Sequence, residues 1–432
     1  MPSRVRYALL SFLSAGVGLA AAGPVLAGGF ALPDQGARAL GLGGAYVARA
    51  SGADSFQSNF AGIAFGDRPE LVIGAASRRS QMKFTGIDPF PGALAEETQK
   101  WIAPPAPTFG YTHPVGERIV LGLGLSQPFD LRTSWDSPTA FSGRFIAQKA
   151  SLTSHAVTTG LAVRLADRLA LGGAVDLHFV RFSAERRLAA VNPFTLRRVD
   201  GATLALTSDT ISALGFRLGF MARPSEAFSL GAAYRQGVSF DLSGTATVER
   251  LPTGVGQLDS YLASVYPPNA LPFSETVSLP SVASAGIAYT VNDWTVSGQV
   301  DIERWGSFGS LAVKVEGAPE LTTTVARDYE DTYALRIGVE RQLNHAWTMR
   351  AGYAYVTSPT STPESLTPVF VDAKRHEIAV GFSVKAGAWR VDLSPGVMLY
   401  AKRATLGVSP EGYDGTYENL VPVFGLTISH AF

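Results

Sequence analysis

Residues 291–304 read VNDWTVSGQVDIER, and this stretch holds both features that decide the fold. A short turn at Asn292-Asp293 is followed by residues that alternate between apolar and polar. The apolar set is Trp294, Val296, Val300 and Ile302, and the polar set is Thr295, Ser297, Gln299, Asp301 and Glu303. Successive side chains of a strand point to opposite faces. The stretch therefore predicts a β-strand with one face against an apolar medium and the other in water.

Two further segments repeat this period of two. In 168–182 the apolar face carries Leu169, Leu171, Val175, Leu177 and Phe179, opposite Asp176 and His178. In 227–243 the apolar face carries Phe228, Leu230, Ala232, Tyr234, Val238, Phe240 and Leu242, opposite Ser229, Arg235, Ser239 and Asp241. In a transmembrane barrel the apolar face meets lipid and the polar face lines the lumen. A half-buried sheet of a soluble protein has the same local period, so the connections must decide.

The connections between apolar segments alternate between short and long. Short turns fall at Pro114-Glu117, Ala166-Arg168, Pro224-Glu226, Asn292-Asp293, Leu343-His345 and Ala386-Ala388. Long polar connections fall near 85–100, 128–143, 185–202, 251–273, 316–325, 358–372 and 403–418. An outer-membrane barrel has this arrangement, with short periplasmic turns and long external loops. A β-sandwich does not separate its loops by length in this way.

The strand segments are fourteen in number, and single-chain bacterial barrels have an even number. They are 70–84, 101–113, 118–127, 144–165, 168–184, 203–222, 227–250, 274–291, 293–315, 326–341, 345–357, 373–385, 388–402 and 419–432. The chain stops on Phe432 after alternating apolar residues, which resembles the signal that the barrel assembly machinery recognises. We predict an all-β protein with a 14-stranded antiparallel transmembrane β-barrel over 69–432.

The amino terminus and the composition agree with an outer-membrane location in a bacterium. Arg4 and Arg6 precede an apolar run over 7–19, and Val25-Leu26-Ala27 fits a cleavage site, so 1–27 are expected to be a signal peptide. An uncleaved anchor is the alternative. The chain has no cysteine, which excludes a disulfide scaffold and thiolate metal sites. Its net charge of zero gives no reason to expect nucleic acid as a partner.

Residues 28–68 lack the strand period and are rich in glycine and alanine. A barrel of this size encloses an opening wide enough to leak small polar solutes unless something fills it. We therefore expect 28–68 to fold back into the barrel as an N-terminal hatch, or plug.

Several stretches resemble the FadL family of outer-membrane transporters of long-chain fatty acids and, in other branches, aromatic hydrocarbons. In the hatch these are Gly36–Ala45, Ala53-Asp54-Ser55 and Asn59–Ala64. In the barrel they are Pro128–Leu131, Gly143-Arg144-Phe145, Trp305, Tyr329–Gly338, Trp347–Tyr355, Ser358-Pro359 and Asp372–His376. The resemblance covers nearly the whole chain after the signal peptide and implies passive uptake of a hydrophobic molecule, most often a long-chain fatty acid.

Two positions depart from the family pattern. The family hatch reads Asn-Pro-Ala where this chain has Asn59, Phe60 and Ala61, so the turn loses proline's fixed φ. Asp130 replaces a glycine that is common in the first long loop. Both departures bear on ligand specificity rather than on the fold.

The resemblance implies that ligand lands between two external loops, here 185–202 and 251–273. The second loop carries Leu258, Tyr261, Leu262 and Val265 at the spacing of a short amphipathic helix. Exposed apolar residues either bind a ligand or pack on one another, and the sequence allows both. Outer-membrane lipid and lipopolysaccharide are the expected surroundings, and we expect a monomer.

Ligand is then expected at the first residues of the hatch, where Gly28, Gly29, Phe30 and Leu32 resemble the family's ligand contacts. The alternative is that Phe30 only packs within the hatch and does not contact a ligand. Release is expected sideways, through a gap at an inward kink of the third strand. Gly122 and Gly124 are candidates for that kink because glycine weakens a strand, although they also suit an ordinary barrel wall.

A carboxylate ligand needs a hydrogen-bond donor once water is removed. By alternation the lumen face offers Arg217, Arg235, Arg336, Arg350 and Arg390. The acids expected on the same faces are Asp241, Asp301, Glu340 and Asp392, so most of these arginines are expected in ion pairs. The sequence leaves open which arginine, if any, meets a ligand.

Enzyme functions find little support. The chain has no Gly-x-Ser-x-Gly motif, and its six histidines lack metal-ligand spacing, so we expect no catalytic residue, no metal and no cofactor. Asp176 and His178 share a face without a nucleophile and are read as a hydrogen-bonded pair. A barrel hydrolase is a remote alternative. A general diffusion porin is a closer one, but it would need a lumen without a plug.

Overall fold

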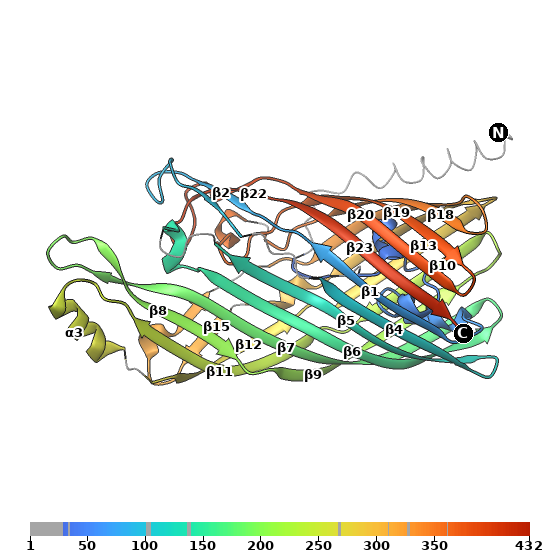
Figure 1. Cartoon of the computed structure of the whole chain (residues 1–432), viewed down its shortest axis with the longest axis horizontal. Helices are drawn as coiled ribbons and strands as arrows, with labels where there is room; N and C mark the ends of the chain where they lie inside the picture. Colours follow the sequence, from blue (N-terminus) through green and yellow to red (C-terminus); the bar gives the residue numbers. More distant parts are fainter. Residues whose placement is uncertain are drawn as a thin grey trace.

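The computed structural model describes residues 29–32, 35–100, 105–135, 140–266, 269–309, 311–325, 329–360 and 362–432. The expected signal peptide and Gly28 lie outside these residues. Helices within the described ranges are all too short or too polar to cross a membrane. The described chain forms a closed antiparallel β-barrel around a small helical hatch (Figure 1).

The barrel wall is one sheet of nineteen labelled segments in which β1 pairs with β23 and closes the ring. In chain order the segments are β1 (Glu70–Arg78), β4 (Ala106–Val115), β5 (Ile119–Ser134), β6 (Lys149–Ala166), β7 (Leu169–Val191), β8 (Arg198–Ser208), β9 (Ile211–Ala222), β10 (Phe228–Arg235), β11 (Val238–Arg250), β12 (Leu271–Leu279), β13 (Val282–Val291), β14 (Trp294–Glu303), β15 (Leu311–Val315), β16 (Thr323–Val325), β17 (Thr332–Gln342), β18 (Trp347–Val356), β19 (Arg375–Ala386), β20 (Trp389–Tyr400) and β23 (Leu420–Ala431). Five strands of the wall are each divided into two consecutive segments, namely β8 and β9, β10 and β11, β12 and β13, β14 and β15, and β16 and β17. The nineteen segments therefore make up the fourteen strands that the sequence predicts.

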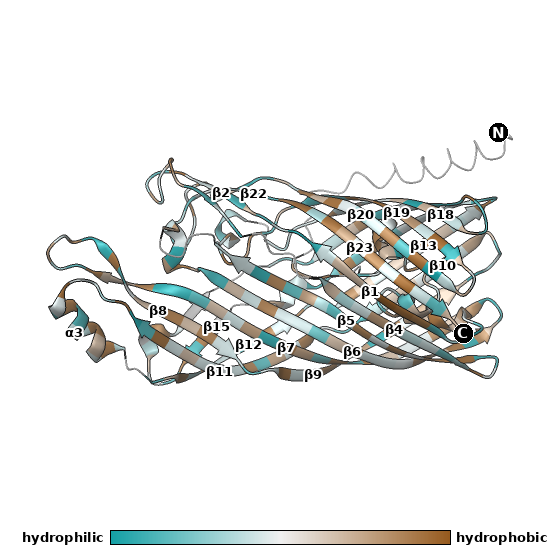
Figure 2. Cartoon of the chain, in the orientation of Figure 1, coloured by the Kyte–Doolittle hydropathy of each residue, from teal (hydrophilic) through white to brown (hydrophobic). Residues whose placement is uncertain are grey.

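Alternation along the strands follows the expected two-faced pattern (Figure 2). In β17 the outward residues Leu335 and Ile337 are 58% and 50% exposed, whereas Ala334 and Arg336 between them are buried. The turns at the end near the C-terminus are short and the loops at the other end are long, as the sequence predicts. Apolar side chains therefore face outward around the wall. The inner face carries polar side chains such as Arg336 and also buried apolar ones such as Phe240 and Leu242.

The alternation predicted for 227–243 is wrong in its second half. The outward residues are even-numbered in β10, but in β11 the even-numbered Val238, Phe240 and Leu242 are buried inside. The strand is interrupted at 236–237, and this break reverses which face meets the lumen. Asp241 consequently lies on the outside, where it accepts a hydrogen bond from Thr276. It does not share the lumen with Arg235.

Several expected boundaries on the external side are also wrong. Instead of one strand over 70–84, β1 ends at Arg78. A separate sheet then combines β2 (Lys83–Gly86) and β3 (Glu96–Thr98) with β21 (Arg403–Ala404) and β22 (Gly415–Glu418). Part of the expected strand 144–165 is the 3₁₀-helix η3 (Ser142–Phe145). Residues 185–202 are no loop, because β7 and β8 extend as a hairpin to a turn at 192–197.

The remaining helical elements are short. The hatch contains α2 (Ala37–Gly41) and the 3₁₀-helices η1 (Ala53–Phe56) and η2 (Phe60–Phe65). The other helical elements come between wall segments in the chain. They are α3 (Gly256–Val265) and the 3₁₀-helices η4 (Trp305–Ser307), η5 (Pro319–Leu321) and η6 (Pro363–Ser365). The helix α3 confirms the predicted amphipathic segment, since Leu258 and Leu262 are buried and Tyr261 is 61% exposed.

Close packing of the hatch requires glycine in the wall. A Cβ atom on Gly172 of β7 would lie 2.6 Å from the backbone nitrogen of Ala61, so no larger residue fits while the hatch stays in place. The next residue, Gly173, has nothing within 4 Å of an added Cβ atom. The hatch therefore contacts the wall directly at backbone level.

These neighbouring glycines give a matched test of the plug. We expect Gly172→Val to displace the hatch and open the lumen to ions, while Gly173→Val leaves the barrel closed because its side chain has free space. Conductance of each purified variant in planar lipid bilayers is the measurement. Equal, closed behaviour of both variants would contradict the packing described here.

Candidate functional site

The first described residues of the hatch run beside β5 as a short extra strand. Ala31 pairs with Phe129 in an antiparallel bridge. The Leu32 backbone nitrogen donates to the Pro128 carbonyl oxygen at 2.8 Å, and the Asp130 nitrogen donates to the Phe30 carbonyl at 3.1 Å. The expected ligand contacts at the amino terminus are thus joined to the third wall strand.

β5 carries a bulge at the same place. Its pairing with β6 is regular from Ile119 to Ser126 and resumes at Phe129 with a shifted register. Pro128 has no N–H to donate, which suits an interruption of the ladder. The side chain of Gln35 bonds the freed backbone of Gln127, accepting from its nitrogen at 3.0 Å and donating to its oxygen at 2.7 Å. The hatch therefore supplies hydrogen bonds that β6 does not.

The expectation of a kink at Gly122 and Gly124 is wrong, because the ladder is unbroken at both. They face the hatch instead. An added Cβ on Gly122 would lie 2.8 Å from Cζ of Phe60, and one on Gly124 would lie 2.4 Å from Cδ2 of Phe56. These glycines leave room for the aromatic rings of the hatch, and the interruption lies at 126–129.

Phe30 lies at the centre of an aromatic cluster. Its ring centroid is 4.8 Å from that of Trp305, 5.5 Å from Phe308, 5.6 Å from Phe370 and 6.1 Å from Phe129. The ring is 6% exposed, so it packs against the protein as the alternative interpretation required. Its role as a ligand contact stays a prediction.

Gly29 and Leu32 hold the segment on either side of Phe30. The Gly29 nitrogen donates to Oδ2 of Asp372 at 3.0 Å, and Leu32 is buried. Burial raises the pKa of the Asp372 carboxyl to about 6, although Arg375 opposes the shift. A cavity of about 160 Å³ adjoins these residues and reaches Leu131.

The hatch turn forms without the family's proline. Asn59 caps η2, because its Oδ1 accepts from the Ala61 nitrogen at 3.1 Å. Its Nδ2 donates to the carbonyl oxygens of Val47 and Phe220, both at 2.9 Å, which ties the turn to the hatch and to β9. Phe60 is the first residue of η2 and is buried beside Gly122.

Four of the five lumen arginines are in ion pairs, as the sequence predicts. The pairs join Arg217 to Asp176, Arg336 to Asp301, Arg350 to Glu340 and Arg390 to Asp392, with nitrogen–oxygen distances of 2.6–3.0 Å. Two of these arginines also bind the hatch, Arg217 through the Phe56 carbonyl and Arg336 through the Gly43 carbonyl, both at 3.0 Å. Arg49 of the hatch adds an ion pair with Glu340.

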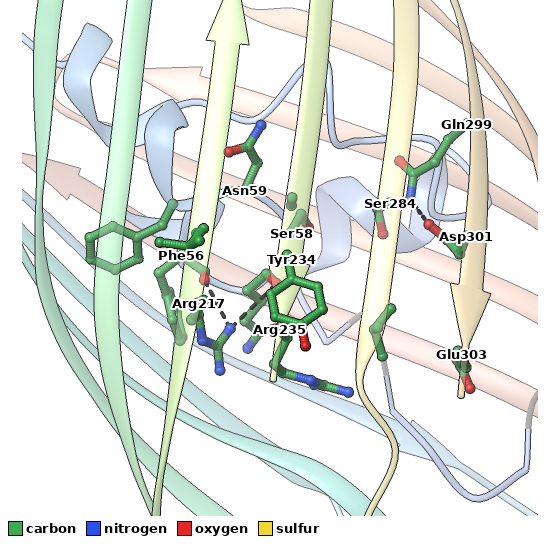
Figure 3. A pocket seen from close by; sticks show the side chains of 15 residues that line it. Phe56, Ser58, Asn59, Arg217, Tyr234, Arg235, Ser284, Gln299, Asp301 and Glu303 are labelled. Carbon is green, nitrogen blue, oxygen red and sulfur yellow. Dashed lines mark hydrogen bonds between the residues drawn. The ribbon is translucent and has the colours of Figure 1, made fainter. Parts of the chain in front are cut away.

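Arg235 differs from the other four. Within the described part of the chain it has no ion pair, and its buried Nε has no hydrogen-bond partner. Its guanidinium carbon lies 5.0 Å from the ring centroid of Phe129. Figure 3 shows Arg235 beside Arg217 on neighbouring strands, and both line a cavity of about 50 Å³ with Glu303.

A third cavity, of about 250 Å³, lies under the external loops between β6, β7, β8 and β12. Its apolar lining includes Ile146, Phe182, Leu204, Leu206, Val313 and Leu321. Sequence reasoning missed this cavity because its residues come from several distant segments. Of the expected landing residues, Leu258 and Leu262 pack against Ala190, Tyr261 is exposed and Val265 is partly buried. Mutual packing therefore accounts for two of the four.

Comparisons with known proteins agree on one family. The profile of a family described as outer membrane protein transport protein (OMPP1/FadL/TodX) matches residues 18–432. The chain belongs to this family. It is an outer-membrane transport protein rather than an enzyme, and its location is the bacterial outer membrane.

Solved structures show the same fold at low identity. A FadL homologue of Pseudomonas aeruginosa is 19% identical, with a TM-score of 0.81, over 94% of this chain and all of that one. The toluene transporter TodX of Pseudomonas putida is 18% identical, with a TM-score of 0.70, over 95% of this chain and 99% of that one. Alkane uptake protein A of Marinobacter nauticus is 24% identical over 108 residues, which is 24% of either chain.

The bond between Gln35 and the bulge can be tested directly. Gln35→Ala should leave the nitrogen and oxygen of Gln127 without partners, and each unpaired buried group costs about 1–3 kcal/mol. We expect hydrogen exchange at the Gln127 amide to accelerate by about tenfold or more. Gln342→Ala, at an exposed turn, serves as the control. Unchanged exchange in Gln35→Ala would show that the hatch does not hold the bulge.

Proposed function

We propose that this family member takes up hydrophobic molecules passively. In this scheme a ligand enters the apolar cavity under the loops, moves to the Phe30 site and leaves sideways through the wall at the β5 bulge. The observation that carries the proposal is the pairing of Phe30, Ala31 and Leu32 with β5 at that bulge. One small segment thereby links the ligand site to the exit.

The loop cavity supports the entry step. Its volume of about 250 Å³ and its apolar lining suit part of a hydrocarbon chain or an aromatic ring. Lys149 and Glu185 line it too and pair with each other at 2.8 Å. An apolar ligand in this cavity exchanges water for contact with Phe182 and Leu204, which is favourable.

The aromatic cluster supports the second step. Phe30 occupies a site bounded by Trp305, Phe308 and Phe370, and a cavity of about 160 Å³ adjoins it. A ligand that replaces the Phe30 ring regains the apolar contacts that the ring makes. Displacement of Phe30 would also pull Ala31 and Leu32 away from β5 and free the bulge.

Exit through the lumen would be costly for such a ligand. The hatch and the ion pairs of Arg217, Arg336, Arg350 and Arg390 lie across the periplasmic half, and the cavity of about 280 Å³ beside Arg350 and Arg390 is lined by charged groups. An apolar molecule passing them would separate buried charges from their partners, at a cost of several kcal/mol for each. The outward face of β5 is instead apolar, with Leu121 and Leu123 exposed, so release into the membrane is the favourable direction.

The ligand class is proposed as a long-chain fatty acid. Arg235 supports it, because it has a buried Nε without a hydrogen-bond partner and no ion pair in the described chain. It lies over Phe129, which contacts Phe30, and is placed to receive a carboxylate. An aromatic hydrocarbon or an alkane, as the names of two relatives suggest, is the second candidate, favoured by the paired state of the other lumen arginines. A general diffusion porin is disfavoured because the hatch fills the lumen.

The remaining partners are proposals as well. We infer that the barrel works as a monomer surrounded by lipid and lipopolysaccharide, and that the barrel assembly machinery inserts it. The regular alternation of exposed and buried residues along β23 supports this last inference.

Uptake of labelled oleate and labelled toluene tests the proposed function. Cells that lack their own hydrophobic transporter should gain oleate uptake when they produce this protein, and Arg235→Met should reduce it. Toluene uptake that Arg235→Met leaves unchanged would favour the hydrocarbon reading. Uptake of neither compound, with a folded barrel confirmed by heat-modifiable migration, would contradict the proposal.

The Phe30 site is tested with purified protein. Phe30→Ala should weaken oleate binding by about 1–3 kcal/mol if the ligand contacts that ring. Deletion of residues 28–34 should abolish uptake and leave a heat-modifiable barrel. An unchanged affinity in Phe30→Ala would assign the ring to packing alone.

A further inference from the structure

The β7–β8 hairpin reaches far beyond the barrel wall. β7 pairs with β9 from Leu169 to Val180 and with β8 from Ser183 onward. Its outward residues are apolar up to Phe179 and become charged at Arg181, which marks the outer edge of the lipid-facing band. Phe194 follows Arg181 by 13 residues, which at ~3.3 Å each is about 40 Å of strand. In Figure 1 the hairpin projects at the end opposite the C-terminus.

The tip of this hairpin is a hydrogen-bonded turn that carries two exposed apolar side chains. Oδ1 of Asn192 accepts from the nitrogens of Phe194 and Thr195 at 2.9 and 3.2 Å, and the Leu196 nitrogen donates to the Asn192 carbonyl at 2.9 Å. Leu196 has φ +54°, a conformation that favours glycine or asparagine over leucine. The turn nevertheless holds Phe194 and Leu196 outward, 76% and 79% exposed.

The hairpin is supported by α3 close to its tip. Ala190 packs with Leu258 and Leu262 in one buried cluster. Since these two leucines are buried by that contact, the large apolar residues that stay exposed on this part of the protein are Val191, Phe194 and Leu196 of the hairpin, together with Tyr261. Neighbouring exposed apolar side chains are typical of binding surfaces.

The tip is also positively charged. Arg197 and Arg198 follow directly, both are exposed, and neither has an ion pair within the described ranges. The hairpin's Asp200 does not neutralise them, because it pairs with Arg144 at 2.8 Å and lies near Arg187. Apolar residues beside unpaired cations are the combination that binds the surface of an anionic lipid assembly.

We propose that the β7–β8 tip docks on anionic amphiphile assemblies outside the cell, such as micelles or droplets with carboxylate head groups. Phe194 and Leu196 enter the apolar layer, and Arg197 and Arg198 contact the head groups. The length of the hairpin favours an assembly in the medium over the membrane that holds the barrel. This docking precedes the proposed uptake, but it is a binding property and stands or fails separately.

A second loop offers a matched control. Leu406, between β21 and β22, is 72% exposed and has φ +56°, so it repeats the exposure and backbone conformation of Leu196. Its neighbouring cations are engaged, since Lys402 pairs with Glu418 and Arg403 donates to Thr360. The control loop is apolar without free cations.

The experiment measures flotation of the full-length protein, held in phosphatidylcholine nanodiscs, with phosphatidylcholine vesicles that contain or lack oleate. Wild type should bind the oleate vesicles. The variant Phe194→Ser/Leu196→Asn should bind them about tenfold more weakly, because two exposed apolar anchors are lost. Arg197→Gln/Arg198→Gln should also lose about tenfold at low salt and erase the preference for oleate. Leu406→Asn should bind like wild type.

Three outcomes would overturn the proposal. In the first, wild type does not bind oleate vesicles. In the second, the tip variants bind them as tightly as wild type. In the third, Leu406→Asn loses as much vesicle binding as the tip variants do. A change in self-association without a change in vesicle binding would assign the tip to contacts between copies and would equally reject lipid docking. Heat-modifiable migration of each variant confirms that its barrel is folded.

Discussion

The structure depends on hydrogen bonds that pass between the hatch and the bulge of β5. A wall inside a membrane has no water to satisfy its backbone, so a strand that leaves its neighbour must find other partners. At the bulge the backbone nitrogen and oxygen of Gln127 bond to the side chain of Gln35, and the Pro128 carbonyl oxygen accepts from the Leu32 nitrogen. The irregular wall and the plugged lumen therefore depend on each other, because the backbone groups at the bulge have their hydrogen-bond partners in the hatch.

The charged lumen follows the same logic. Arg217 and Arg336 each bind a wall carboxylate and a hatch carbonyl, so the hatch is held by groups that would otherwise be buried and unsatisfied. This network makes the direct path to the periplasm unfavourable for an apolar molecule. The Phe30 segment, by contrast, is held to β5 by a few backbone hydrogen bonds and by apolar contacts. A hydrophobic ligand can replace the apolar contacts.

Much of the fold could be predicted from the sequence, because loop length and the period of two are local properties. The fourteen strands, the external helix over 256–265 and the paired state of four lumen arginines were all accessible in this way. The predictions were wrong where contacts between distant segments determine the structure. The break at 236–237 reverses the face that simple alternation predicts for the rest of the strand, so Asp241 was wrongly expected on the lumen face. Gly122 and Gly124 make room for Phe60 and Phe56, which no local pattern reveals, and the bulge lies at 126–129 instead.

The most direct test of the account is to staple the amino-terminal segment to the wall. Ala31 and Phe129 form a non-hydrogen-bonded antiparallel pair, a geometry whose Cα separation of about 4.5 Å suits a disulfide. The chain has no cysteine of its own, so Ala31→Cys/Phe129→Cys introduces a single possible bridge. Uptake of labelled oleate and toluene by this variant is compared before and after reduction. The account predicts no uptake when the bridge is formed and recovery on reduction. Equal uptake in both states would show that release does not require this segment to leave β5.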